Sequence, residues 1–374
     1  MTLSPEILQY IEEHADQAQK LLMDLAQIPA PSNHEQARAS FCLDWLHSMG
    51  AEGAYIDDAL NVIYPIGDDG QNNLMVFMAH SDVVFPDTTP LPLKIENGRI
   101  FCPGVGDDTA NAVALLTAAG YIARQNLKPA CCGVLLVINS GEEGLGNLKG
   151  SRKIMEDFGS RVKEFITFDG NANVVVTKAV GSRRYRITVK TEGGHSYARF
   201  GVPNAIAQLA ALVTRLYQVQ VPPIGRTTYN VGTISGGTSV NTIAQTAEML
   251  YEFRSDEREG LSYMQAEFDR IVEEFRAFGV QIEEEVVGDR PCGLDVDNSA
   301  LAQRAAQSVQ KHYDRLPQFG CGSTDANVPL SMGIPAICAG CVLGAGAHTR
   351  EEYVEIDSLL PGLKVAAELI LYHF

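Results

Sequence analysis

The sequence predicts an α/β fold with a mainly parallel mixed sheet flanked by helices, interrupted by an inserted α+β sandwich domain. Three short apolar runs, residues 74–79, 134–139 and 164–168, are nearly continuous, as in strands buried on both faces of a parallel sheet. Helical segments alternate with these runs, which is typical of strand–helix–strand units. The chain of 374 residues is long enough for two domains of about 100–200 residues each.

The helices are predicted from spacing and from their first residues. One begins at Ser4, where a proline follows in the first turn, and a second covers residues 36–49. A third, rich in Ala and Leu, covers residues 110–125. We expect Asp108 or Thr109 to cap its N-terminus.

The pattern changes near residue 180. From there the sequence predicts a strand (185–190), a glycine-rich loop (191–203) and a helix (204–216). Two strands (228–235 and 247–255) and a second helix (261–278) follow. This order resembles an α+β sandwich more than a continuation of the parallel sheet. We therefore predict a main domain in two parts, residues 1–180 and 290–374, with residues 181–289 inserted.

Composition excludes several classes of protein. With 29 Lys and Arg against 46 Asp and Glu, the net charge is −17, which disfavours binding to nucleic acid or to anionic membranes. No apolar stretch approaches the ~20 residues of a membrane span. The eight cysteines are scattered, so we expect reduced thiols. Because no secretory pattern is visible, we expect a cytoplasmic protein.

Polar residues follow directly after each of the three apolar runs. His80-Ser81-Asp82 follows the first run, Glu142-Glu143 the second, and Asp169 the third. Ligands of open α/β sheets bind beyond the carboxyl ends of the strands, so these side chains should meet in one crevice. Such a concentration of carboxylates requires cations. Imidazole and carboxylate ligands favour Zn²⁺, with Mn²⁺ or Co²⁺ as substitutes.

Individual residues in this crevice have local interpretations. Asp82 can hold one ring nitrogen of His80 while the other binds metal. Asp107, in a loop before a helix, should face the crevice. Glu142 and Glu143 can divide two tasks, one binding metal and one transferring a proton.

Several other polar segments are expected to have no role in catalysis. The doublets Glu12-Glu13, Glu273-Glu274 and Glu351-Glu352 are interpreted as solvated surface. The segment from Gly322 to Ala326 should begin a helix, with Ser323 or Thr324 as its cap.

These motifs together resemble the co-catalytic zinc exopeptidase and deacylase family, which includes aminoacylase, peptidase T, bacterial glutamate carboxypeptidase and acetylornithine deacetylase. The matching blocks occur in family order and span nearly the whole chain: His80-Ser81-Asp82, Gly106-Asp107-Asp108, Gly141-Glu142-Glu143-Gly144, Phe168-Asp169-Gly170 and Gly346-Ala347-His348.

The resemblance implies a centre of two divalent ions, Zn²⁺ or alternatively Co²⁺ or Mn²⁺. It implies that Asp107 bridges the ions, that His80 and Asp169 complete one site, and that Glu143 and His348 complete the other. It also implies that Asp82 orients His80, that Glu142 is the general base acting on a metal-activated water, and that the Asp107–Asp108 peptide bond is cis.

In the family, the inserted domain is a lid that also forms a homodimer. By resemblance, His195 in this domain donates to the oxyanion, either within one chain or across the dimer. Asn241 and Arg254 resemble the residues that bind the substrate carboxylate, and the planar guanidinium of arginine suits this task. The main-chain N–H groups around Gly346 can contact the same carboxylate.

We therefore expect a hydrolase that cleaves an amide bond next to a free carboxylate in a small peptide, as a di- or tripeptidase or exopeptidase. An N-acyl-amino-acid deacylase is the alternative, and a non-catalytic binding homologue is a more distant one. Thiol chemistry at the Cys338-Ala339-Gly340-Cys341 segment is a further alternative, although this CxxC lies in an apolar run with no second pair.

Overall fold

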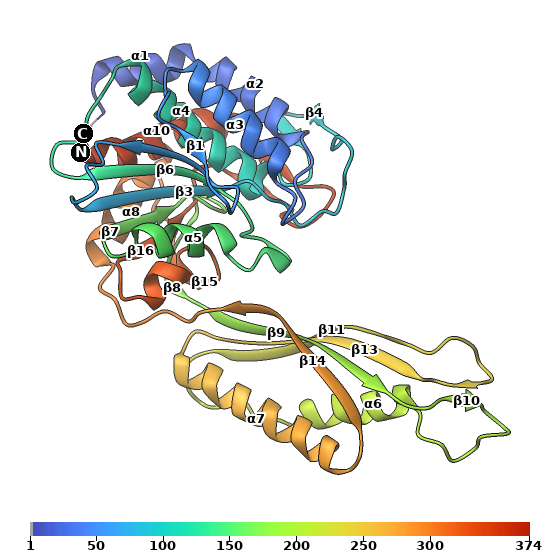
Figure 1. The fold of residues 1–374 in the computed structure, drawn as a ribbon. Helices are drawn as coiled ribbons and strands as arrows, with labels where there is room; N and C mark the ends of the chain where they lie inside the picture. The colour runs from blue at the N-terminus through green and yellow to red at the C-terminus, as the bar shows by residue number, and fades with distance from the viewer. Residues whose placement is uncertain (1–2) are drawn as a thin grey trace. The chain divides into compact units, whose positions relative to one another are not determined.

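The computed structural model describes residues 3–374, which form two compact units (Figure 1). Unit 1 contains the chain up to Ala179 together with Leu294–Phe374. Unit 2 is Val180–Gly293. The predicted inserted domain, residues 181–289, lies within unit 2.

Unit 1 is built on an eight-stranded mixed sheet in the order β1-β2-β6-β3-β7-β16-β8-β15. The central pairs β3–β6, β3–β7 and β7–β16 are parallel, as is β8–β15, whereas β1–β2, β2–β6 and β8–β16 are antiparallel. The strands are β1 (Tyr55–Ile56), β2 (Val62–Ile66), β3 (Leu74–His80), β6 (Gly133–Asn139), β7 (Val162–Thr167), β8 (Val174–Ala179), β15 (Gln318–Gly322) and β16 (Ala336–Ala339).

Alternate side chains of β3 pack into separate hydrophobic clusters on the two faces of the sheet. Val76 and Met78 pack in a cluster that includes residues of α5 (Lys149–Phe158) and α9 (Asn327–Ser331). Phe77 and Ala79 pack in a larger cluster with the remaining helices of unit 1. These are α1 (Pro5–Glu13), α2 (Ala15–Ala26), α3 (Gln36–Ser48), α4 (Ala110–Arg124), α8 (Ser299–Tyr313) and α10 (Ile356–Ile370). Burial on both faces explains why the apolar runs are continuous.

A second sheet of unit 1 joins two loops that are distant in sequence. Its order is β17-β18-β5-β4, from the strands β4 (Lys94–Glu96), β5 (Arg99–Phe101), β17 (Gly344–Ala345) and β18 (Tyr353–Glu355). In the antiparallel pair β5–β18, Phe101 lies opposite Tyr353. The loop after β5 and the loop before β18 are therefore neighbours.

Unit 2 is an antiparallel four-stranded sheet, order β11-β13-β9-β14, that shares a hydrophobic core with two helices. Its elements are β9 (Gly181–Lys190), β10 (Gly194–His195), α6 (Ala205–Leu216), β11 (Thr227–Gly236), β12 (Thr242–Ile243), β13 (Thr246–Ser255), α7 (Arg258–Ala277) and β14 (Gln281–Arg290). The edge strand β14 was not predicted from the sequence.

No disulfide joins the eight cysteines, all of which lie within residues 3–374, and five of them are buried. Over the same residues, every helix is too short or too polar to cross a bilayer.

The contact between α8 and α10 leads to a prediction about pH. The buried Glu368 carboxylate lies 2.7 Å from both His312 Nε2 and Lys311 Nζ. Although burial opposes the shift, these two partners lower the pKa of Glu368 to about 2, against an ordinary value of 4.5. The stabilisation is therefore present at neutral pH and is lost as the pH falls from about 4.5 towards 2.

We expect Glu368→Gln to lower the free energy of unfolding by about 2 kcal/mol at neutral pH, because it weakens charged hydrogen bonds in a buried position. Urea titrations should show this difference from the wild type shrinking over the acid range. A difference that stays constant down to the lowest pH would contradict the assignment.

Candidate metal centre

The carboxyl ends of three parallel strands carry the predicted metal-binding residues. His80 is the last residue of β3 and lies opposite Asn139, the last residue of β6. Glu142 and Glu143 follow β6, and Asp169 follows β7, which pairs with β3 on its other side. Because the three strands are parallel and adjacent, their ends lie at one edge of the sheet.

Two histidines that are far apart in the sequence both lie beside the Asp107 carboxylate. His80 Nε2 lies 3.1 Å from Asp107 Oδ1, and His348 Nε2 lies 3.2 Å from Asp107 Oδ2. His348 Nε2 is also 2.9 Å from Glu143 Oε1. Each oxygen of the Asp107 carboxylate therefore faces a different imidazole.

Asp169 completes the set of five predicted ligands. Ligand atoms of His80, Asp107 and Glu143 all lie within 4.8 Å of one another, and so do those of His80, Asp108 and Asp169. The structure thus gathers all five side chains and adds Asp108, which the sequence analysis did not assign to the crevice.

Burial of these charges shifts their pKa values strongly. Burial and the neighbouring Asp107 charge raise the pKa of Asp169 to about 7. Hydrogen bonds to Asp107 and Glu143 raise the pKa of His348 to about 10. For Asp107, burial is outweighed by the bonds from His348 and His80, which lower its pKa. Buried carboxylates placed this close together offer strong sites for cations.

The donors fit a pair of divalent ions. Imidazole nitrogens and carboxylate oxygens are the usual ligands of Zn²⁺ outside thiolate sites. A carboxylate whose two oxygens face two separate imidazoles has the arrangement required of a bridge between two ions. We find no residue within this cluster that would exclude a metal.

Asp82 has more partners than the sequence analysis indicated. His80 Nδ1 is 3.0 Å from the main-chain oxygen of Asp82 and 3.5 Å from its Oδ1. The Asp82 carboxylate accepts hydrogen bonds from the main-chain N–H of Glu142 and of Glu143, each at 2.9 Å, and from Ser32 Oγ at 2.6 Å. Asp82 therefore fixes the turn that carries both glutamates as well as lying beside His80.

We expect Asp82→Asn to lower kcat/KM by about 10–100-fold. The NH₂ group of the asparagine side chain would face the main-chain N–H of either Glu142 or Glu143, which would lose its acceptor. Steady-state kinetics with metal content measured in parallel would test this effect. Asp24→Asn is the control, because the Asp24 side chain is 42% exposed. Wild-type kinetics in Asp82→Asn would contradict the positioning role.

The loop before α4 confirms one prediction and corrects another. The Asp107–Asp108 peptide bond is cis, as the resemblance implied. Neither Asp108 nor Thr109 caps α4 through its side chain. Asp108 instead accepts hydrogen bonds from the His80 main-chain N–H at 2.9 Å and from Asn111 Nδ2 at 2.6 Å. The capping interpretation was wrong because Asp108 is buried against the end of β3.

Two further buried carboxylates were missed. Glu352 was expected to be solvated, yet it is buried and accepts three main-chain hydrogen bonds. Asp325 is also buried, and its Oδ2 accepts a 2.6 Å bond from Asn139 Nδ2 at the end of β6. The helix expected near Ser323 or Thr324 begins only at Asn327, so this segment reaches the sheet as a loop.

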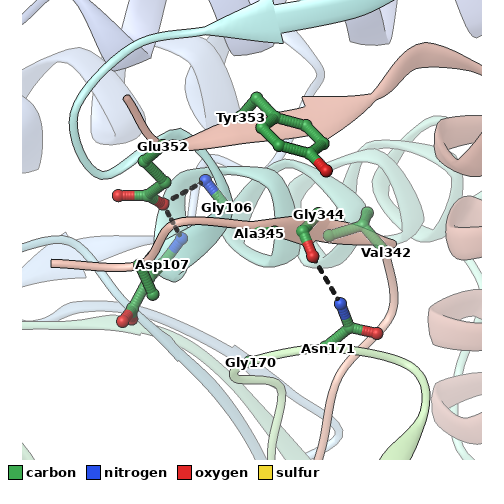
Figure 2. Close-up of a pocket in the computed structure, with 10 residues that line it drawn as sticks. Gly106, Asp107, Gly170, Asn171, Val342, Gly344, Ala345, Glu352 and Tyr353 are labelled. Carbon is green, nitrogen blue, oxygen red and sulfur yellow. Dashed lines mark hydrogen bonds between the residues drawn. The ribbon is translucent and has the colours of Figure 1, made fainter. Parts of the chain in front are cut away.

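A small pocket of about 90 Å³ lies beside Asp107 (Figure 2). Its walls include Val342, Ala345 and the Tyr353 ring, and no lysine or arginine of residues 3–374 lines it. Asn171 Nδ2 donates a 2.9 Å bond to the Gly344 oxygen at its lower wall. Asp107 and Glu352 also line the pocket, so it lies directly beside the cluster.

The predicted residues of the inserted domain lie in unit 2. His195 Nδ1 accepts the N–H groups of Tyr197 at 3.3 Å and Ala198 at 3.4 Å. The Asn241 main-chain oxygen accepts the Ser196 N–H at 2.9 Å, so His195 and Asn241 lie on neighbouring segments. Arg254 donates two 3.0 Å bonds to Glu252. The roles predicted for these residues stay predictions.

A parallel sheet whose carboxyl edge gathers histidines and carboxylates in this manner is characteristic of metal-dependent hydrolases. Residues 76–372 match the sequence profile of Peptidase family M20/M25/M40. The chain belongs to this family and is a metallopeptidase, which confirms the family resemblance.

Individual relatives are distant. The chain is 25% identical over 346 residues to acetylornithine deacetylase of Myxococcus xanthus, covering 85% of this chain and 86% of the relative. Among solved structures, it is similar to the dipeptidase Dug1p of Saccharomyces cerevisiae, with a TM-score of 0.78, 16% identity and 98% of each chain covered.

Two further structures share the fold. A tripeptidase of Staphylococcus aureus has a TM-score of 0.76 at 20% identity, covering 95% of this chain and 97% of its own. The YXEP protein of Bacillus subtilis, described as a dinuclear metal binding peptidase, has a TM-score of 0.65 at 16% identity, covering 96% and 98%.

Proposed function

We propose that this protein is a dinuclear-metal-dependent peptidase that cleaves the amide bond next to a free carboxylate in a small peptide. The observation that carries the proposal is the position of Asp107, whose two carboxylate oxygens face His80 and His348 separately. In this proposal Asp107 would bridge two ions, His80 and Asp169 would hold one of them, and Glu143 and His348 would hold the other. When bound, the ions act as Lewis acids at the reacting carbonyl.

Glu142 is the proposed general base. It takes a proton from the attacking water and returns it to the leaving amine. Its place is supported by Asp82, whose Oδ1 accepts the Glu142 main-chain N–H at 2.9 Å. The side chain is buried, so the base works away from bulk water.

Further substrate contacts are proposed from the resemblance to the family. His195 accepts N–H groups at Nδ1, so its neutral ring carries the proton at Nε2, where it can donate to the oxyanion. Arg254, Asn241 and the N–H groups around Gly346 bind the substrate carboxylate. For this task Arg254 must exchange its partner Glu252 for the substrate.

The second candidate is an N-acyl-amino-acid deacylase, which the similarity to acetylornithine deacetylase favours. Both reactions cleave an amide and leave a free carboxylate nearby. They differ in the group on the other side of the bond, an amino acid or an acyl chain. The metal cluster by itself does not distinguish between the two substrates.

A hydrolysis screen separates the two candidates. Dipeptides, tripeptides, and N-acetyl and N-succinyl amino acids are incubated with the Zn²⁺-, Co²⁺- and Mn²⁺-loaded protein. We expect peptides with a free C-terminal carboxylate to be cleaved fastest, and the matching C-terminal amides to be poor substrates. Preference for N-acyl amino acids would favour the deacylase, and no hydrolysis with any bound metal would overturn both.

We also infer a homodimer formed through unit 2. Strand β11 is at the edge of its sheet, and residues 232–240 are exposed. An exposed edge strand is a ready site for pairing with a second copy. Sedimentation analysis should give a dimer for the wild type and a monomer for Ile234→Lys. The cytoplasmic location stays a prediction.

A further inference from the structure

Glu352 is the last residue of the loop that carries His348, and its side chain is buried against the loop that carries Asp107. Its Oε1 accepts the main-chain N–H groups of Gly106 and Asp107, each at 2.8 Å (Figure 2). Its Oε2 accepts the N–H of Gly104 at 2.7 Å. One carboxylate therefore binds three N–H groups of the loop that contains the proposed bridging ligand.

The main chain of Glu352 also contacts the strand that leads into this loop. The Cys102 N–H donates to the Glu352 oxygen at 3.2 Å. The next residue, Tyr353, lies opposite Phe101 in the β5–β18 pair. Glu352 is thus fixed to the Asp107 loop through both side chain and main chain, and it follows His348 by only four positions in the sequence.

Two glycines of the loop leave little room for a side chain, and at Gly106 the nearest neighbour is the Glu352 carboxylate. Gly104 has a φ of 76°, and an added Cβ would lie 2.2 Å from Val83 Cγ1. At Gly106 an added Cβ would lie 3.3 Å from Glu352 Oε1. A side chain at Gly106 would therefore press directly on the carboxylate, which shows how closely the loop fits around Glu352.

A buried carboxylate is costly unless hydrogen bonds satisfy it, and here both oxygens are satisfied by the same short loop. An apolar side chain of similar size could not replace Glu352, because it would leave three N–H groups without their acceptor. Because all three N–H groups donate to the Glu352 carboxylate, it fixes the orientation of the loop main chain that carries them.

We propose that Glu352 is a positioning residue that sets the Asp107 carboxylate against His348 for metal binding. The inference rests on the proposed function for its purpose. The loop contacts themselves do not depend on that function. In this proposal Glu352 is not a metal ligand and acts through Asp107, whose main-chain N–H it accepts.

Glu352→Gln tests the role with little change in volume. Gln keeps one acceptor oxygen but places an NH₂ group against the remaining N–H donors. We expect the dissociation constant for Zn²⁺, measured by competition with a chromophoric chelator, to rise by about 10–100-fold. We also expect a changed visible absorption spectrum of the Co²⁺-loaded protein and faster amide hydrogen exchange of residues 102–108 in the metal-free protein.

The neighbouring substitution Glu351→Gln is the matched control, because it removes the same charge at an exposed position. It should leave the Zn²⁺ affinity, the Co²⁺ spectrum and the exchange rates unchanged. Equal Zn²⁺ affinity and equal exchange in Glu352→Gln and wild type would overturn the proposal, and so would the same losses in Glu351→Gln.

Gly106→Ala provides a second route if Glu352→Gln does not fold. The added methyl presses on the carboxylate from the loop side, and we expect the same changes in Zn²⁺ affinity and Co²⁺ spectrum to a smaller degree. Wild-type values in Gly106→Ala would then overturn the proposal. If the wild type binds Zn²⁺ but hydrolyses no amide, the proposed function fails and these measurements still decide the role of Glu352.

Discussion

Replacing Glu142 with alanine should lower turnover by about 10²–10⁴-fold, because the attacking water and the leaving amine lose their proton carrier. This corresponds to about 3–5 kcal/mol of activation free energy. The Asp82 carboxylate accepts the main-chain N–H groups of Glu142 and Glu143, and these two bonds do not involve the Glu142 carboxylate, so the turn with Glu143 should stay in place in Glu142→Ala.

The measurement combines kcat with metal content for wild type, Glu142→Ala and Glu142→Gln. We expect both variants to keep the wild-type metal content. The exposed Glu13→Ala is the control for loss of an acidic residue at the surface. Full turnover in Glu142→Ala would show that another group is the base, and loss of metal would show that Glu142 is a ligand.

Asp107→Ala should abolish both metal binding and activity, the largest effect expected in this protein. Each of its oxygens faces a different histidine, so its loss affects both proposed sites at once. We expect a loss of activity of at least about 10⁴-fold, as for removal of a whole catalytic unit. Metal analysis after dialysis and activity assays with added Zn²⁺ would measure the two losses together.

Chelation of the wild type provides the reversible counterpart. Activity should disappear when the metal is removed and return when Zn²⁺, Co²⁺ or Mn²⁺ is added, whereas Asp107→Ala should not recover. Alkylation with iodoacetamide should have little effect, although Cys131 and Cys321 are exposed. Activity that survives chelation but not alkylation would favour thiol chemistry instead.

The strands that position the site were predictable because burial on both faces leaves a strong signal. The runs at residues 74–79 and 134–139 correspond to β3 (Leu74–His80) and β6 (Gly133–Asn139). The polar residues just beyond them could then be placed at one edge of the sheet. Convergence of His348 was not predictable from periodicity, since it depends on the distant pairing of β5 with β18.

Elements stabilised by charge were not predictable. Strand β14 is rich in glutamate and lacks a clear apolar alternation, yet it pairs with β9 along its length. Its Glu283 and Glu285 form ion pairs of 2.7 Å and 2.6 Å with Lys190 and Arg186 of β9. Cross-strand pairs of this kind replace the apolar pattern that strand prediction uses.

Glu352 shows the same difficulty at a single residue. In sequence it is half of a Glu-Glu doublet that resembles three others in the chain. Only the second residue of the doublet is buried, because only its side chain accepts hydrogen bonds from the N–H groups of a distant loop, in which Asp107 lies 245 positions earlier in the sequence. Such a long-range partnership leaves no local mark in the sequence.

The two histidines of the cluster differ sharply in their access to water. The His80 side chain is 0% exposed, whereas that of His348 is 57% exposed. An ion held through His348 has a short way out to solvent, and one held through His80 does not. We therefore expect a rapid-mixing experiment with excess chelator to release the first equivalent of Zn²⁺ well before the second, so that the protein passes through a state with a single ion.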